Sequence, residues 1–161
     1  MKMEVEFNVK IQTMDLYDFK LQHTYRQAVN IIVTGLGLFL VYGFISTHKW
    51  LYLVAAVIVV FYNPVVLLMK SFLQAKSVET FKNGLTYVLK EEGITVRYGE
   101  EENLIGWDSI VRACNTQRSI FLYTSKSSAF ILPRKEMGER TQDALEMIFT
   151  HVDPSVMKIK Y

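Results

Sequence analysis

The chain has 161 residues, half of them hydrophobic, and a formal net charge of +2. This length suits one modest domain with an additional segment. So small a net charge, with no basic groove interleaved with aromatic side chains, argues against nucleic acid as a partner. The single cysteine, Cys114, cannot form a disulfide within the chain.

The N-terminal segment, residues 3–11, alternates apolar and polar side chains without interruption from Met3 to Ile11. This period of two predicts a β-strand with one buried face. A strand is not stable alone, so it needs a sheet to join. We expect that sheet to be encoded after residue 85.

Two long apolar runs occupy residues 28–45 and 50–69, and Lys49 is the only charged residue from Ala28 to Met69. At about 1.5 Å per residue they reach about 27 and about 30 Å, enough for a bilayer core of about 30 Å. Buried core helices are the alternative, but two such helices are out of proportion in so short a chain. A cleavable signal peptide fits poorly, because acidic residues precede the first run. We therefore predict a transmembrane helical hairpin with a short polar tip.

Helices are also predicted on both sides of the hairpin. Residues 13–27 form one, which Thr13 or Asp15 can cap, and we expect it to run into the first span. Residues 70–84 are expected to continue the second span along the membrane interface and to end at Gly84.

The charges that flank the apolar runs predict the topology. One basic residue lies at the tip of the hairpin, and five lie near its base: Lys20, Arg26, Lys70, Lys76 and Lys82. The positive-inside rule then places both termini in the cytoplasm. The N-terminal strand can join a sheet encoded beyond the hairpin only if both ends of the hairpin lie on the same side of the membrane.

Asn30 and Asn63 are the only asparagines in the two apolar runs. A hairpin that turns at residues 47 and 48 brings their depths within about one helical turn of each other. An interhelical hydrogen bond is the interpretation we favour, worth about 0.6–2 kcal/mol in a membrane. The alternative is a polar site for an ion or a lipid head group. Pro64 is expected to kink the second helix.

From residue 85 the chain changes to short strand patterns separated by turn signals, which is typical of an antiparallel sandwich or barrel. Residues 138–152 follow as a helix with one apolar stripe, suited to covering a sheet. We expect a small pleckstrin-homology-like barrel or sandwich with a C-terminal helix. The fold class is thus an α+β membrane protein, divided at residues 1–27, 28–69, 70–84 and 85–161.

Two short motifs in this part are candidates for binding a partner or a lipid. Trp107 and Asp108 end a strand pattern; Trp107 is either a structural residue or an exposed aromatic anchor, and we favour the structural role. Arg134 and Lys135 follow the last strand pattern. They face either solvent, which we favour, or acidic lipid head groups or a partner's carboxylate.

Residues that could carry catalysis are scarce. His23, His48 and His151 lie before the first span, at the tip and after the last helix, so they do not converge on a metal or a nucleophile. The acidic run of residues 100–102 lacks a calcium-loop pattern and is expected to be a solvated turn. Cys114 lies on a strand pattern, where a buried thiol is expected. We predict no catalytic residue, no metal ligand and no cofactor.

The order of a strand, a two-helix hairpin and a set of strands resembles the YcxB-like family of small bacterial membrane proteins. The most specific matches are Trp107-Asp108-Ser109-Ile110 and the strand that ends in Phe130-Ile131-Leu132-Pro133-Arg134. The resemblance implies a pleckstrin-homology-like domain anchored at the bacterial cell membrane, and it brings no catalytic motif.

Three classes of function remain. We favour a non-catalytic binding or regulatory protein of the inner membrane, with the lipid bilayer and either a protein or further copies of itself as partners; immunity and support of a membrane complex are examples. The alternative is an oligomeric transporter or channel component that uses the polar residues of the spans. A membrane enzyme is the third class, and loss of turnover on replacing one polar residue would identify it.

Overall fold

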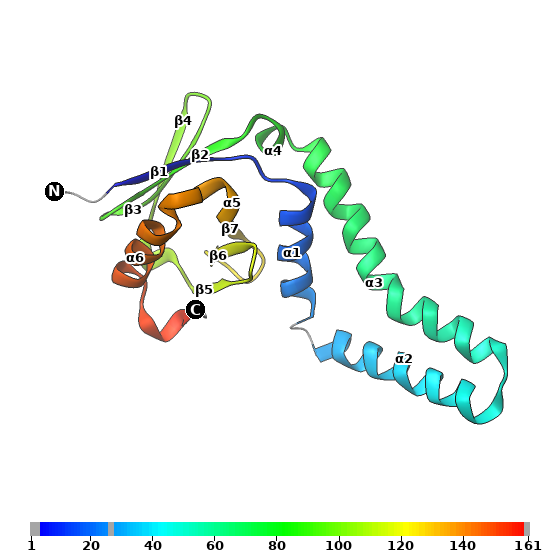
Figure 1. Cartoon of the computed structure of the whole chain (residues 1–161). Helices are drawn as coiled ribbons and strands as arrows, with labels where there is room; N and C mark the ends of the chain where they lie inside the picture. The colour runs from blue at the N-terminus through cyan, green and yellow to red at the C-terminus, as the bar shows by residue number, and fades with distance from the viewer. Residues whose placement is uncertain (1–3, 26–27, 160–161) are drawn as a thin grey trace.

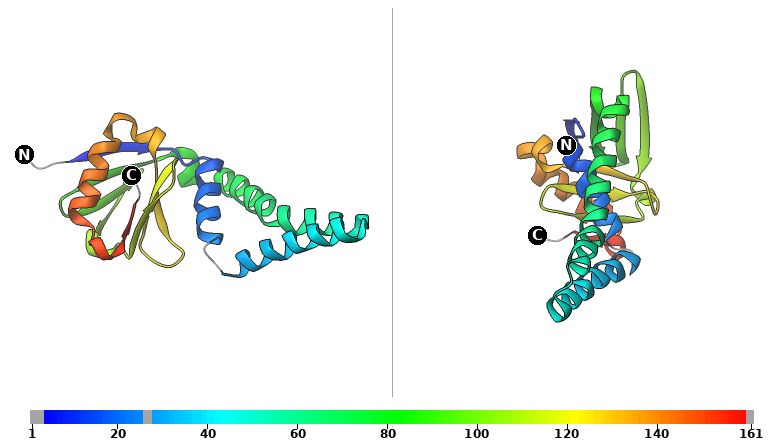
Figure 2. Two further views of the ribbon diagram at one scale, coloured as in Figure 1. Left: turned by 60° about the horizontal axis from the view of Figure 1, so that its bottom comes forward. Right: turned by 90° about the vertical axis from the view of Figure 1, so that its right-hand side faces the viewer.

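The computed structural model describes residues 4–25 and 28–159, so Met3 of the expected strand and the flanking Arg26 lie outside the described residues. Strands and short helices form a sheet part at one end, and a long helical arm extends away from it (Figure 1; Figure 2, left). The protein is therefore α+β, with two long apolar helices and largely antiparallel sheets.

The first sheet joins the N-terminal strand to strands that follow the helical arm in sequence. Its order is β1-β2-β3-β4, all antiparallel, with β1 Val5–Val9, β2 Leu85–Lys90, β3 Gly93–Tyr98 and β4 Glu101–Gly106. Val5, Phe7 and Val9 are buried and the residues between them are exposed. Val9 pairs with Leu85 and Val5 with Leu89. The strand thus finds the sheet that its alternating pattern requires.

The second sheet has the order β7-β6-β5-β8, and its last pair is parallel. Its strands are β5 Arg112–Asn115, β6 Ser119–Tyr123, β7 Ala129–Pro133 and β8 Met157–Lys158. Within the described residues β4 pairs only with β3, because the 3₁₀ turn η1 (Trp107–Ser109) ends the first sheet before β5 begins. Of the two forms expected, barrel or sandwich, the barrel is therefore wrong: the described residues form two separate sheets.

Both sheets share one core with the C-terminal helix. After α5 (Arg134–Met137) and the turn η2 (Gly138–Arg140), α6 (Thr141–His151) buries Ala144, Met147 and Ile148. The turn η3 (Pro154–Val156) then leads into β8. Buried side chains of β1, β2, β6, β7 and α6 belong to a single cluster.

The helical arm consists of α1 Thr13–Thr24, α2 Ala28–Thr47, α3 Trp50–Ser77 and the short α4 Glu79–Asn83. The helix expected over residues 13–27 ends at Thr24, and residues 26 and 27 lie outside the described part of the chain. The Asn30 side-chain amide donates to the Thr24 carbonyl at 2.8 Å, so that carbonyl is satisfied without a further helical turn. α3 continues through Pro64.

α2 and α3 contact each other at several levels, from the Asn30–Asn63 hydrogen bond at the base to Gly43 near the tip, but most of their surface is not buried. A Cβ on Gly37 would collide with Val60, and one on Gly43 would press on Tyr52. His48 has a positive φ of 55° between the helices, which lets the chain reverse within two residues. Only 11% of the apolar window 30–47 and 6% of the window 50–77 are buried.

Candidate functional site

Within the arm, helix α1 contacts the second sheet. The Phe19 ring lies 5.6 Å from the ring of Phe121 and 5.8 Å from that of Tyr123 on β6. Beside these rings, Thr116 Oγ1 donates a short hydrogen bond to the Asp18 carboxylate. The arm is therefore fixed to the second sheet by both apolar and polar contacts.

Asn30 and Asn63 are hydrogen-bonded across the two long helices. Asn63 Nδ2 donates to Asn30 Oδ1 at 2.9 Å, while Asn30 Nδ2 donates to the Thr24 carbonyl. The polar groups of Asn30 are thus engaged within the chain. The pair clamps the base of the hairpin to the corner between α1 and α2, and a further role as an ion or lipid site stays a prediction.

Trp107 is 7% exposed and belongs to the shared core. Its Nε1 donates to the Lys90 carbonyl at 2.9 Å, and its ring stacks on His151 with the ring centroids 5.6 Å apart. The hypothesis of an exposed aromatic anchor is therefore wrong for this residue. Trp107 instead joins the end of β2 to the end of α6.

Asp108 is exposed beside Trp107. Its Oδ1 lies so close to Gly106 that a Cβ there would collide with it. Because Asp108 is exposed and Trp107 is buried, a partner could contact the Asp108 carboxylate but not the Trp107 ring. Its role as a binding residue stays a prediction.

Arg134 and Lys135 begin α5 directly after β7. Arg134 is half-buried; its backbone N–H donates to the Arg118 carbonyl at 2.8 Å. Lys135 is exposed, with its ammonium 3.4 Å from the Glu136 carboxylate. Arg134 and Lys135 thus lie together at the start of α5. Within the described part of the chain, neither of them has a hydrogen bond or an ion pair with Asp108.

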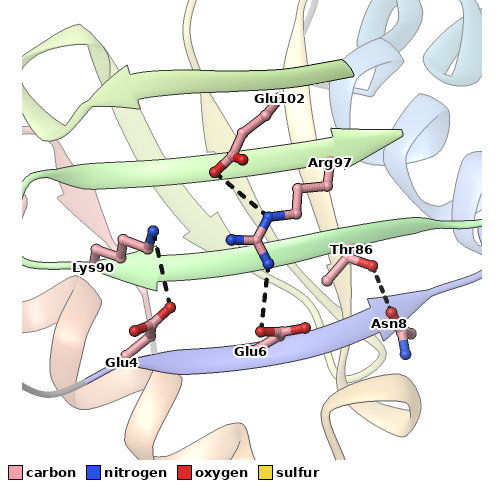
Figure 3. A network of polar contacts seen from close by, with 7 residues as sticks. All are labelled: Glu4, Glu6, Asn8, Thr86, Lys90, Arg97 and Glu102. Carbon is pink, nitrogen blue, oxygen red and sulfur yellow. Dashed lines mark hydrogen bonds and ion pairs between the residues drawn. The ribbon is translucent and has the colours of Figure 1, made fainter. Parts of the chain in front are cut away.

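The outer face of the first sheet carries a row of paired polar side chains (Figure 3). Arg97 lies between Glu6 at 3.6 Å and Glu102 at 3.4 Å, and Lys90 lies 3.9 Å from Glu4. Glu101 and Glu102 belong to β4, so the acidic run of residues 100–102 is only partly a turn.

A second charged surface lies where the sheet part meets the arm. An open hollow of about 420 Å³ is lined by Lys10, Lys76 and Lys82 and by uncharged residues: Ile11, Gln12, Thr13, Met14, Ala75 and Phe81. We call it the basic hollow. From the sequence, Lys76 and Lys82 were interpreted only as topology signals and Lys10 only as an exposed residue at the end of a strand. Only the pairing of β1 with β2 brings the three lysines together.

Burial also changes the protonation of several groups in the sheet part. It raises the pKa of the Cys114 thiol above its ordinary value and the pKa of Tyr123 to about 12. Tyr87 also has a raised pKa because it is buried. On α1, burial and the charge of Lys70 lower the pKa of Lys20. Cys114 is thus a buried thiol with little thiolate at neutral pH.

The three histidines lie apart, each against an aromatic ring: His23 against Phe19, His48 against Phe44 and His151 against Trp107. Within residues 4–25 and 28–159, no three His, Cys, Asp or Glu side chains are placed to hold a metal ion.

Residues 89–149 match the family of YcxB-like proteins, which confirms the resemblance for this part of the chain. The match covers β3 to most of α6, with the turn of Trp107 between the sheets. No curated protein and no solved structure matches the chain.

Proposed function

We propose, with the YcxB-like match as the premise, that this protein is a non-catalytic binding or regulatory protein of the bacterial inner membrane. α2 and α3 span the bilayer, and the sheet part is a pleckstrin-homology-like domain at its cytoplasmic face. The observation that carries the proposal is the exposed apolar surface of these two helices.

That surface is too large for a soluble monomer. Ile32, Phe39, Leu51 and Ile58 are each 60% exposed or more, and similar side chains cover both helices. Contiguous apolar patches on soluble monomers rarely exceed a few hundred Å². α2 has 20 residues and α3 has 28, so both reach across a bilayer core of about 30 Å.

The arrangement of the sheet supports the topology. β1 precedes the hairpin and β2 follows it, yet the two strands are hydrogen-bonded neighbours. Both ends of the hairpin must therefore lie on one side of the membrane. The basic residues favour the cytoplasm for that side, because Lys20, Lys70 and Lys76 lie near the base and Lys49 lies at the tip.

A binding role fits the sheet part better than catalysis does. Cys114 is buried with a raised pKa, and the ion pairs on the outer sheet face engage Arg97 and Lys90. The partner is a protein or a second copy of this chain in the plane of the membrane. The transporter alternative is less favoured, because the Asn30 and Asn63 amides bond each other instead of lining a path.

Cysteine accessibility tests the proposal. In a Cys114→Ala background, Lys49→Cys at the tip and Lys126→Cys in the β6–β7 loop each provide one exposed thiol. We expect a membrane-impermeant maleimide to label the tip cysteine in intact cells and the loop cysteine only after the cells are permeabilised. Labelling of the loop cysteine in intact cells would contradict the topology. Recovery of the wild-type protein in the soluble fraction would contradict the membrane location.

A further inference from the structure

The basic hollow collects three cations from three separate segments. Lys10 lies in the link between β1 and α1, Lys76 in the last turn of α3, and Lys82 in α4. All three side chains are exposed around the hollow. This convergence concentrates positive charge where the arm enters the sheet part.

These charges are not neutralised within the described part of the chain. No acidic residue lines the hollow, and none of the described carboxylates lies within ion-pair distance of its three lysines. Asp15, in the first turn of α1, is buried and accepts a hydrogen bond from the Gln12 backbone instead. On the outer face of the first sheet, by contrast, Lys90 and Arg97 each have an acidic partner.

The rest of the lining is uncharged and largely apolar. Met14 on α1, Ala75 on α3 and Phe81 on α4 supply apolar side chains beside Ile11, and Gln12 and Thr13 are its polar members. A ligand that fits this lining carries negative charge together with an apolar part. An amphiphile with a phosphate meets both conditions, while a free phosphate ion uses only the charge.

The position of the hollow along α3 points to the same chemistry. The apolar side chains Phe72 and Leu73 are 46% and 59% exposed, and Lys76 follows one turn later. The Lys76 ammonium lies 4.2 Å from the centroid of the Phe72 ring. Lys76 therefore follows the exposed apolar side chains of α3 directly, at the level where an anionic head group would lie if that apolar surface is in the bilayer.

We propose that the basic hollow binds the phosphate of an anionic phospholipid in the leaflet next to the sheet part. This inference rests on the proposed membrane function and names a ligand for a surface that this function leaves unassigned. A lysine near an anionic membrane surface strengthens binding by roughly fivefold, so removing all three lysines weakens it by about two orders of magnitude.

Native mass spectrometry of the detergent-purified full-length protein tests this. Phosphatidylglycerol and phosphatidylcholine with the same acyl chains are titrated separately into wild type, K10Q/K76Q/K82Q and the control R118Q/K126Q/K158Q. The control removes the same number of charges from exposed sites of the sheet part. We expect wild type and control to prefer phosphatidylglycerol and the hollow variant to lose that preference. The variant K10R/K76R/K82R should retain it.

Three results would overturn the inference. The hollow variant could retain phosphatidylglycerol as well as wild type does, or the control could lose it equally. Millimolar inorganic phosphate could displace the lipid completely, which would assign the site to a soluble phosphate. Membrane fractionation of the wild-type protein is carried out beside these titrations. Recovery of the protein in the soluble fraction would refute the proposed function itself.

Discussion

Replacement of Phe7 by alanine tests whether the N-terminal strand is part of the core of the sheet part. Phe7 is 5% exposed, pairs with Tyr87 across β1 and β2, and has its ring centroid 6.0 Å from that of Tyr87. Removing a buried phenylalanine costs about 3–5 kcal/mol. A whole domain is stable by about 5–15 kcal/mol, so this one change removes a large share of the total.

Urea unfolding of the full-length protein in detergent, followed by Trp107 fluorescence, measures the loss. Trp50 is replaced by Phe in this background, so that the one remaining tryptophan reports on the shared core. Asn8→Ala is the matched control, because Asn8 lies on the opposite, exposed face, where its Oδ1 accepts a hydrogen bond from the Thr86 hydroxyl at 2.6 Å. We expect it to cost about 1 kcal/mol or less. Equal midpoints for Phe7→Ala and Asn8→Ala would refute the reasoning.

Further predictions concern the same core and the hairpin. Residues 85–161 expressed alone should be unfolded by circular dichroism, because four buried side chains of the N-terminal segment contribute about 1.5–3 kcal/mol each; a cooperative unfolding transition would contradict this. Trp107→Phe should cost about 0.5–1.5 kcal/mol in thermal unfolding, since it removes the hydrogen bond from the indole to the Lys90 carbonyl; an unchanged midpoint would count against that hydrogen bond. Asn63→Leu should destabilise the hairpin by about 0.6–2 kcal/mol in a detergent-denaturation assay. Unchanged stability would show that the Asn30–Asn63 hydrogen bond contributes nothing. Cys114 should react slowly with iodoacetamide until urea unfolds the protein, and rapid alkylation of the native protein would exclude a buried thiol. The free energy of unfolding should also fall as the pH rises above the ordinary cysteine pKa, because at that pH only the unfolded chain releases the thiol proton.

Patterns that depend on one element and its period were predictable from the sequence. The alternation around Phe7 requires a sheet, and the hairpin leaves only the strands after residue 85 to supply it. Counting back from the turn placed Asn30 and Asn63 near one depth, where the hydrogen bond lies. The first inference needs only the period of a strand, and the second only a fixed rise per residue and a known point of reversal.

Features that depend on where two elements meet were not predictable in this way. α1 ends at Thr24, and the Thr24 carbonyl accepts a hydrogen bond from a side chain six residues later, a contact that no helix propensity encodes. Trp107 is buried because α6 brings His151 against it, and a single-strand pattern gives no sign of that contact. The basic hollow requires the β1–β2 register, so its lysines appear unrelated in the sequence.

The pairing of β1 with β2 also determines the order of events when the chain is made. A ribosome releases β1 first, but its partner emerges only after both apolar helices have been synthesised. If only one helix inserted, Val9 and Leu85 would be left on opposite sides of the bilayer and the first sheet could not close. In the proposed topology, completion of the sheet part thus depends on complete insertion. A wrongly inserted copy would keep an unfolded segment, which proteases can recognise and remove.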